Sequence, residues 1–431
     1  MMPKMYTGLR ELIAAGRPAR HAVAYTADGA IVWEEFAALI AAHGAALKDA
    51  ARILLAETDP IAFAARLLAT LAAGKTPVIA PNFQPETLTR LQQCLDAEEA
   101  PIADSIEIYT SGSSGEPKRV VKRLVQFEAE CCAQESLWGV TIGCAAVTAT
   151  VPHNHIYGLL FRLLWPLLAG RPFDNVTCAN PAMLVERLQA LGEAILVSSP
   201  AQLSRLPELN DLATMTYRPK MIFSSGAPLD AATAQRYFTA WRQAPIEIFG
   251  STESGGIAWR RQEGGEPVWA PLPGVTVASD DDSALLIRSP FLFDDQPLRM
   301  EDAVTLQPDG CFRLGGRLDR IVKIEEKRLS LPEMEARLAE CPLVEKAAIV
   351  PLSSHARRVV VGAVIVASNL GKAQLALGRR TVILELRRHL ARSFDAVLLP
   401  RRWRFVEHLP YNERSKLTAA ALAALFEDDA E

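Results

Sequence analysis

The stretch that decides the fold reads Tyr109-Thr110-Ser111-Gly112-Ser113-Ser114-Gly115-Glu116-Pro117-Lys118. It extends a strand-like run near 106–110. Its glycines let backbone N–H groups approach oxygen atoms closely, its hydroxyls donate further hydrogen bonds, and Lys118 adds a positive charge. This composition predicts a loop that holds phosphate, with a flexible surface turn as the alternative. The loop is not the P-loop of NTPases, which requires Gly-x-x-x-x-Gly-Lys-Ser/Thr.

On both sides of this loop, short β-branched runs alternate with amphipathic segments. This alternation is typical of repeated βα units around mostly parallel sheets, so the fold class is α/β. Residues 1–318 are predicted to form a large domain that ends in a β-rich subdomain over about 255–318. The pattern then restarts as a small α+β domain over 319–431. Because no linker rich in Ser, Pro or Gly separates the two, we expect a hinge and a mobile small domain.

Composition excludes several classes of protein. The chain has 431 residues, 46 Lys+Arg against 50 Asp+Glu and a net charge of −4, so nucleic acid is not an expected partner. We find no apolar run long enough for a signal peptide or a membrane span, and we expect a cytoplasmic protein. His153 and His155 form a His-x-His pair, but further ligands at useful spacing are missing, so we do not expect a zinc site.

Residues 109–118 match throughout the phosphate loop of the adenylate-forming superfamily, which includes acyl- and aryl-CoA synthetases, adenylation domains of peptide synthetases, and luciferases. Further matches follow in the family's order, so the chain resembles this superfamily over nearly its whole length. The resemblance implies ATP-dependent activation of a carboxylic acid to an acyl adenylate, then transfer to the thiol of coenzyme A or of a carrier-protein phosphopantetheine. It implies phosphate contacts from Thr110, Ser111, Gly112, Ser113, Ser114, Gly115 and Lys118.

A second match, Phe249-Gly250-Ser251-Thr252-Glu253, resembles the family's aromatic-Gly-x-Thr-Glu element and also follows a strand-like run. Mg²⁺ is a hard cation that binds acidic side chains together with phosphate oxygens, so Glu253 is the candidate metal ligand. Thr252 would donate to the α-phosphate. Phe249 and Gly250 would lie against the nucleotide. The alternative is an ordinary turn with a solvated glutamate.

Two further elements would form the substrate pocket and the adenine site. The segment around His155, Tyr157 and Gly158 resembles the family's aromatic-Gly element, so these residues would flank the substrate carboxylate; a core histidine with a packed tyrosine is the alternative. Ser225-Gly226-Ala227 ends a strand-like run, where doubly wound sheets bind ligands. By resemblance, Ser225 would line the pocket, and Gly226 and Ala227 would pass under the adenine.

The remaining matches concern the ribose, the hinge and the catalytic lysine. Asp302 aligns with the family's ribose-binding aspartate, with Glu301 as an alternative because Met300-Glu301 replaces the usual Thr-Gly. Arg317 would reach the ribose, and Asp319 would be the hinge. Lys416 aligns with the lysine that enters the site during adenylation, so the resemblance assigns catalysis to Lys416, Thr252, Glu253 and His155.

Two departures from the family concern the thioester step. Glu326 and Ser415 stand where most relatives carry glycine, and the first of these positions adjoins the pantetheine tunnel. An accessory protein that binds nucleotide without forming a thioester is therefore the alternative function. A serine hydrolase using Ser111 or Ser113 is disfavoured because neither residue lies in a Gly-x-Ser-x-Gly elbow.

The acid and the acceptor are predicted only by class. The first domain is short, as in compact ligases of aryl polyene and similar pathways, which load an aromatic or short acid onto an acyl carrier protein. An arginine-rich carboxyl-terminal domain could steer such a small acidic carrier, although a solvated helix face balanced by nearby acids would have the same composition. These arginines are the pairs at 357–358, 379–380, 387–388 and 401–402, plus Arg404.

Overall fold

The computed structural model describes residues 6–95, 100–111, 117–264, 268–324, 327–353, 359–411 and 417–427. The chain forms two compact units. The first comprises Met1–Ala278, Leu286–Leu298 and Leu306–Arg313, and the second comprises Ser279–Leu285, Arg299–Thr305 and Leu314–Glu431. Among the described residues, no helix combines the length and the apolar character that a membrane crossing needs.

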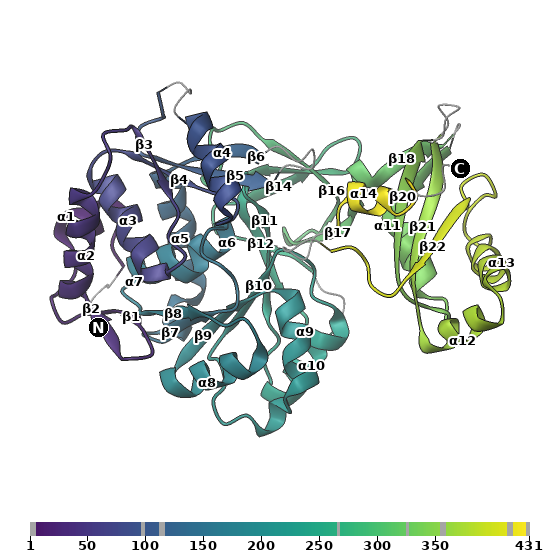
Figure 1. Ribbon diagram of the computed structural model, residues 1–431, viewed down its shortest axis with the longest axis horizontal. Helices are drawn as coiled ribbons and strands as arrows, with labels where there is room; N and C mark the ends of the chain where they lie inside the picture. Colours follow the sequence, from purple (N-terminus) through teal and green to yellow (C-terminus); the bar gives the residue numbers. More distant parts are fainter. Residues whose placement is uncertain are drawn as a thin grey trace. The chain divides into compact units, whose positions relative to one another are not determined.

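A nine-stranded sheet is the main scaffold of the first unit (Figure 1). Its central pairs are parallel, and antiparallel pairs occur towards both edges, which confirms the predicted α/β class. In sheet order its strands are β13 (Ala270–Pro271), β12 (Gly255–Arg261), β11 (Ile246–Ser251), β10 (Ile222–Ser225), β9 (Ala194–Ser198), β7 (Ala146–Ala149), β8 (Phe173–Thr177), β1 (Ala22–Tyr25) and β2 (Ala30–Val32).

A second sheet of this unit carries the predicted phosphate loop. It consists of β3 (Arg52–Leu55), β4 (Thr76–Ile79), β5 (Ser105–Ser111) and β6 (Pro117–Arg123), in that order. β3, β4 and β5 run parallel, whereas β5 and β6 form an antiparallel hairpin. A buried ion pair at 3.0 Å between Arg52 Nε and Glu107 Oε1 links β3 to β5. The predicted strand at 106–110 is confirmed, but its antiparallel partner was not predicted.

Helices cover both faces of the nine-stranded sheet. Side chains alternate between the two faces of a strand, and on β10 Ile222 packs with α8, α9 and α10 while Phe223 contacts Trp138 and Phe161 on the other face. The helices of this unit are α1 (Leu9–Ala15), α2 (Trp33–Ala45), α3 (Pro60–Ala72), α4 (Pro85–Leu95), α5 (Leu124–Ile142), α6 (Ile156–Gly158), the π-helix η1 (Leu159–Leu164), α7 (Trp165–Ala169), α8 (Pro181–Leu191), α9 (Pro200–Leu209), the 3₁₀ turn η2 (Leu212–Thr214) and α10 (Ala231–Trp241).

The β-rich subdomain predicted between 255 and 318 contains a four-stranded sheet whose residues are divided between the two units. Its strands are β14 (Thr276–Ser279), β15 (Ala284–Arg288), β16 (Leu298–Leu306) and β17 (Phe312–Arg317), in that order. The short 3₁₀ turn η3 (Leu318–Arg320) follows β17.

The rest of the second unit is an α+β arrangement around a three-stranded sheet. α11 and α13 pack on one face of this sheet, and α14 packs on the other. β22 forms an edge of the sheet and runs parallel to β21. The elements are the hairpin β18 (Ile321–Ile324) and β19 (Lys327–Ser330), α11 (Leu331–Ala339), β20 (Val344–Ser353), β21 (Val359–Ala367), α12 (Asn369–Leu377), α13 (Arg379–Leu390), β22 (Arg402–Val406) and α14 (Ala419–Ala424).

Candidate functional site

The predicted phosphate loop connects the two strands of the β5–β6 hairpin. Thr110 pairs with Lys118 across the hairpin, and Thr110 Oγ1 donates to the Lys118 carbonyl oxygen at 3.4 Å. Ser111 pairs with Pro117 in the last register position. Gly112, Ser113, Ser114 and Gly115 lie outside the described residues. The hairpin therefore fixes both ends of the loop, and Lys118 stands at its exit.

Lys118 and Glu253, from the two strongest sequence motifs, are in direct contact. Lys118 Nζ donates to Glu253 Oε1 at 2.7 Å, although the two residues are 135 positions apart. Their side chains are 62% and 38% exposed, so both face solvent and a ligand could reach them. Burial acts to raise the pKa of Glu253, but hydrogen bonds from Lys118 and Ser251 outweigh it and lower that pKa. Glu253 is therefore a carboxylate at neutral pH.

Glu253 lies in a tightly bonded turn between β11 and β12. Ser251 N donates to Ser254 Oγ at 2.9 Å, and Ser254 Oγ donates to the Gly255 carbonyl oxygen at 2.7 Å. A Cβ atom on Gly250 would lie 2.2 Å from that same carbonyl oxygen, so only glycine fits there. The turn also holds Thr252, half-buried beside Glu253. The backbone thus places Thr252 and Glu253 together at one end of the sheet.

Below this turn lies a buried charged group that sequence reasoning missed. Glu130 Oε1 on α5 accepts the Gly256 N–H at 2.8 Å, and Lys122 Nζ donates to the Phe291 carbonyl oxygen at 2.8 Å. Burial raises the pKa of Glu130, and the charge of Lys122 opposes that rise. Burial likewise lowers the pKa of Lys122, opposed by Glu130 and Glu253. Glu130 and Lys122 therefore support the turn electrostatically from inside the protein.

The predicted nucleotide and substrate segments end on neighbouring strands. β10 and β11 are parallel, with Ser225 beside Ile248, and Ser225 Oγ donates to the Ile248 carbonyl oxygen at 2.9 Å. Gly226 follows with φ +95°, a left-handed conformation that favours glycine, and Ala227 is exposed. The carboxyl ends of these strands therefore bring Ser225, Gly226 and Ala227 to the same edge as Phe249 and Gly250.

An aromatic cluster borders this edge. The Tyr157 ring lies 5.0 Å from Phe161, and Phe161 lies 5.1 Å from Phe223 on β10. The Tyr157 hydroxyl is near the backbone of Ser198 at the end of β9, and burial raises the pKa of Tyr157 well above its usual value. A Cβ on Gly158 would meet the Pro152 carbonyl oxygen at 2.0 Å, which explains the glycine.

The two histidines of the His-x-His pair have different surroundings. His155 caps the start of α6 and is half-buried. His153 is buried, with Nε2 3.0 Å from the Glu57 carbonyl oxygen and its ring 4.5 Å from Phe63. Burial and the nearby Arg162 lower the pKa of His153 to about 4. His153 is thus a core residue, and no cluster of three metal-ligating side chains occurs in the described part of the chain.

The remaining predicted site residues belong to the second unit. Arg317 Nη1 on β17 lies 3.8 Å from Asp302 Oδ2 on β16, so these two predicted ribose ligands are neighbours. Glu301 instead pairs with Arg299, whose Nη1 lies 3.1 Å from Glu301 Oε1. Asp319 is in the η3 turn. Lys416, Glu326 and Ser415 lie outside the described residues, so their roles stay predictions.

Comparisons with known proteins identify the family and the fold of the chain. The family model described as AMP-binding enzyme matches residues 52–286. A 4-coumarate–CoA ligase of Rhodobacter capsulatus is 27% identical over 311 residues, which cover 71% of this chain and 73% of the relative. A D-alanine–D-alanyl carrier protein ligase of Staphylococcus aureus is 22% identical over 354 residues, covering 73% and 70%. The structure of ATP-bound MatB from Rhodopseudomonas palustris superposes with a TM-score of 0.77 at 17% identity, covering 99% of this chain and 100% of that one.

Proposed function

This chain belongs to the AMP-binding enzyme family and is an acid–thiol ligase, and from that premise we propose that it activates an aromatic or short-chain carboxylic acid with ATP and Mg²⁺. The acyl group would then pass to a carrier-protein phosphopantetheine or to coenzyme A. The observation that carries the proposal is the 2.7 Å contact between Lys118 and Glu253. It joins the exit of the phosphate loop to the candidate metal ligand.

Charge neutralisation and alignment are what the first step requires. The acid is already ionised at pH 7, so no general base is needed. One of its carboxylate oxygens attacks the α-phosphorus, the bond to the bridging oxygen breaks, and pyrophosphate leaves with that electron pair. Because two anions must meet, Lys118 and Thr252 would bind phosphate oxygens, and Lys416 would add a second ammonium group.

Glu253 fits the proposed metal. It offers hard oxygen ligands, is half-exposed and has a lowered pKa, all of which suit a magnesium ion shared with phosphate. When bound, Mg²⁺ would neutralise charge on the triphosphate. Lys118 already contacts one carboxylate oxygen of Glu253, so its ammonium group and a metal ion held by Glu253 would lie near each other and could both bind phosphate oxygens.

Nucleotide recognition would come from several segments of residues 1–318. We assign Gly226, Ala227, Phe249 and Gly250 to the adenine, and Asp302 with Arg317 to the ribose hydroxyls. Asp302 is preferred to Glu301 because Glu301 pairs with Arg299. In this proposal residues 1–318 bind nucleotide and acid, and residues 319–431 form a cap that turns about Asp319. The acceptor's sulfur would then attack the acyl carbon, and AMP would leave.

The aromatic cluster supports an aromatic or short acid. Tyr157 contacts Phe161, Phe161 contacts Phe223, and Trp138 lies 5.0 Å from Phe223. Phe161, Phe223 and Trp138 are buried, so the half-buried Tyr157 is the ring of this cluster that would face a bound acid, and a flat ring there favours an aromatic group or a short chain. Ser225, His155 and Gly158 would border the carboxylate. One relative is named for 4-coumarate and coenzyme A and the other for a carrier protein, so both acceptors are to be tested.

Pyrophosphate exchange tests the first step directly. The protein is screened with ATP, Mg²⁺ and a panel of aromatic, short-chain and long-chain acids. We expect exchange that depends on both the acid and Mg²⁺, and we expect Lys416→Ala to reduce it by orders of magnitude. ATP binding without exchange for any acid would instead indicate the nucleotide-binding accessory protein suggested by Glu326 and Ser415. The preferred acid is then offered coenzyme A and a holo carrier protein in parallel.

A further inference from the structure

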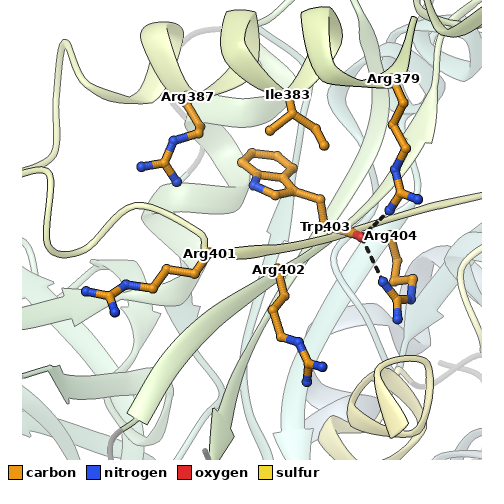
Figure 2. A pocket seen from close by; sticks show the side chains of 7 residues that line it. All are labelled: Arg379, Ile383, Arg387, Arg401, Arg402, Trp403 and Arg404. Carbon is orange, nitrogen blue, oxygen red and sulfur yellow. Dashed lines mark hydrogen bonds between the residues drawn. The ribbon is translucent and has the colours of Figure 1, made fainter. Parts of the chain in front are cut away.

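Arginine side chains cluster beside Trp403 in the second unit (Figure 2). Arg379 Nη2 and Arg404 Nη1 both donate to the Trp403 carbonyl oxygen, at 2.8 and 3.2 Å. Arg404 Nε also donates to the Leu425 carbonyl oxygen at 2.7 Å, and its guanidinium lies 5.0 Å from the centre of the Phe426 ring. These contacts give both arginines a role in the packing of the second unit that needs no ligand.

In the first unit, Glu247 on β11 is a buried carboxylate, 2% exposed, beside the predicted adenine site. Arg260, its register partner on β12, donates from Nε to Glu247 Oε1 at 2.8 Å and from Nη2 to Oε2 at 2.9 Å. Gln262 Nε2 donates to Oε1 at 2.7 Å, and Leu229 N donates to Oε2 at 2.9 Å. A carboxylate has about four acceptor positions, and these hydrogen bonds fill them.

Two of these donors hold the loop 226–228, which follows β10 and contains the residues predicted to pass under the adenine. Leu229, the next residue, is bound at both of its backbone groups: its N–H by Glu247, and its carbonyl oxygen by Gln262 Nε2 at 2.8 Å. On the other side of the loop, Ser225 Oγ donates to a carbonyl oxygen of β11 at 2.9 Å. Hydrogen bonds therefore hold the loop at both of its ends.

The same network reaches Phe249, the aromatic residue predicted to lie against the adenine. Glu247 and Phe249 are two residues apart on β11, a spacing that places side chains on one face of a strand. The Arg260 guanidinium lies 4.5 Å from the centre of the Trp269 ring, and the Trp269 ring lies 5.6 Å from that of Phe249. One set of contacts therefore supports both the loop 226–228 and the aromatic ring.

We propose that Glu247, Arg260 and Gln262 are positioning residues for the adenine base, because they hold the loop 226–228 and Phe249 in the conformation that binds nucleotide. This inference rests on the proposed function, which assigns that loop and that ring to the adenine. The acceptor positions of Glu247 are filled within the protein, so Glu247 acts through the loop and not by contacting the base. A loop that is already ordered loses little entropy on binding, so the network should raise the affinity for adenine nucleotides. The competing explanation is that the network only holds β12 against β11.

Variants at Gln262 test the proposal while Glu247 and Arg260 keep each other as partners. Gln262→Met has a similar length but removes the donor to Glu247 and to the Leu229 carbonyl oxygen. Gln262→Lys supplies an ammonium donor for the same two acceptors. The matched control is Gln235→Met, at an exposed position of α10. Calorimetric titration of the full chain measures the affinity for ATP with Mg²⁺, for AMP, and for tripolyphosphate, which carries no base. Circular dichroism and thermal unfolding verify that each variant folds.

We expect Gln262→Met to weaken the binding of ATP and AMP roughly tenfold and to leave the affinity for tripolyphosphate within about twofold of the parent. Gln262→Lys should recover most of the loss, and Gln235→Met should match the parent. An unchanged affinity for ATP in Gln262→Met, an equal loss for tripolyphosphate, or no recovery in Gln262→Lys would each overturn the proposal. If the affinities follow the expected pattern but the parent exchanges no pyrophosphate with any acid, the proposed function fails and the positioning role stands.

Discussion

Replacing Glu130 by glutamine removes one charge from the buried group beneath the Glu253 turn. Glutamine keeps the side-chain volume and an oxygen for the Gly256 N–H, which Glu130 now binds at 2.8 Å. It leaves the Lys122 ammonium, 2% exposed, without its buried counter-charge. Lys122 and Glu130 interact through their charges without a direct ion pair, so the loss should not exceed the roughly 3–5 kcal/mol that removing one partner of a direct buried pair costs. We expect about 3 kcal/mol here, since Lys122 keeps its bond to the Phe291 carbonyl oxygen.

The matched change at the second residue of the buried group is Lys122→Met. Gln126 Nε2 also donates to the Phe291 carbonyl oxygen at 2.8 Å, so this acceptor stays satisfied. Glu130 can take up a proton because burial already raises its pKa. We therefore expect a loss of only about 1 kcal/mol. The double variant has no buried charge at this place, and its loss should be close to that of Lys122→Met alone.

Urea unfolding followed by tryptophan fluorescence measures these differences in the first unit. Six of the seven tryptophans, at positions 33, 138, 165, 241, 259 and 269, lie in that unit. A double-mutant cycle should give a coupling of about 2–3 kcal/mol, with the double variant more stable than Glu130→Gln. Losses of the two single variants that simply add would refute the reasoning, because independent sites have no shared charge interaction.

Three further predictions concern other parts of the first unit. His153→Gln keeps a donor for the Glu57 carbonyl oxygen and removes a titrating group. The unfolded histidine, with a pKa near 6.5, binds protons that the folded one, with a pKa of about 4, does not. As pH falls from 6.5 to 4, the free energy of unfolding of the parent should therefore fall by up to about 3 kcal/mol relative to that of the variant, measured by urea unfolding at several pH values. Gly250→Ala would place a Cβ 2.2 Å from the Gly255 carbonyl oxygen and should abolish most pyrophosphate exchange. The control is Gly44→Ala in α2, whose Cβ would meet nothing within 4 Å and which should leave exchange unchanged. Equal exchange in both variants would contradict the close approach of Gly250 to Gly255. Lys118→Met removes a hydrogen bond that lowers the pKa of Glu253, so the acid limb of the pH profile of pyrophosphate exchange should move to higher pH. An acid limb at the same pH would show that Lys118 does not control the titration of Glu253.

Much of the scaffold could be predicted because its signals are local. Buried parallel strands read as continuous apolar runs, as Ala194–Ser198 does, and the strand-end position of Ser225 and Phe249 follows from the same pattern. α9 was not predicted, since polar residues and Pro207 interrupt its apolar periodicity. The segment Ile156–Ala169 is helical throughout, but it contains a π-helix that apolar periodicity does not distinguish from an α-helix.

The buried part of the site could not be predicted, because it depends on contacts between distant segments. Glu130 lies on the buried face of α5 with Phe127 and Gln134, and a charged residue at that helical spacing from Phe127 was the available signal. Its partner, Gly256, is 126 residues away. Lys122 is one of four basic residues of β6, at positions 118, 119, 122 and 123, and nothing in the local pattern distinguishes a buried lysine from an exposed one. Sequence patterns identify strands and loops, but they do not show which charges the packing encloses.

The contact between Lys118 and Glu253 spans two separate sheets, since β6 belongs to the four-stranded one and β11 to the nine-stranded one. The triphosphate site therefore depends on how the two sheets pack, because each sheet can complete its own hydrogen bonds without this contact. The turnover rate should therefore report how well the two sheets pack against each other.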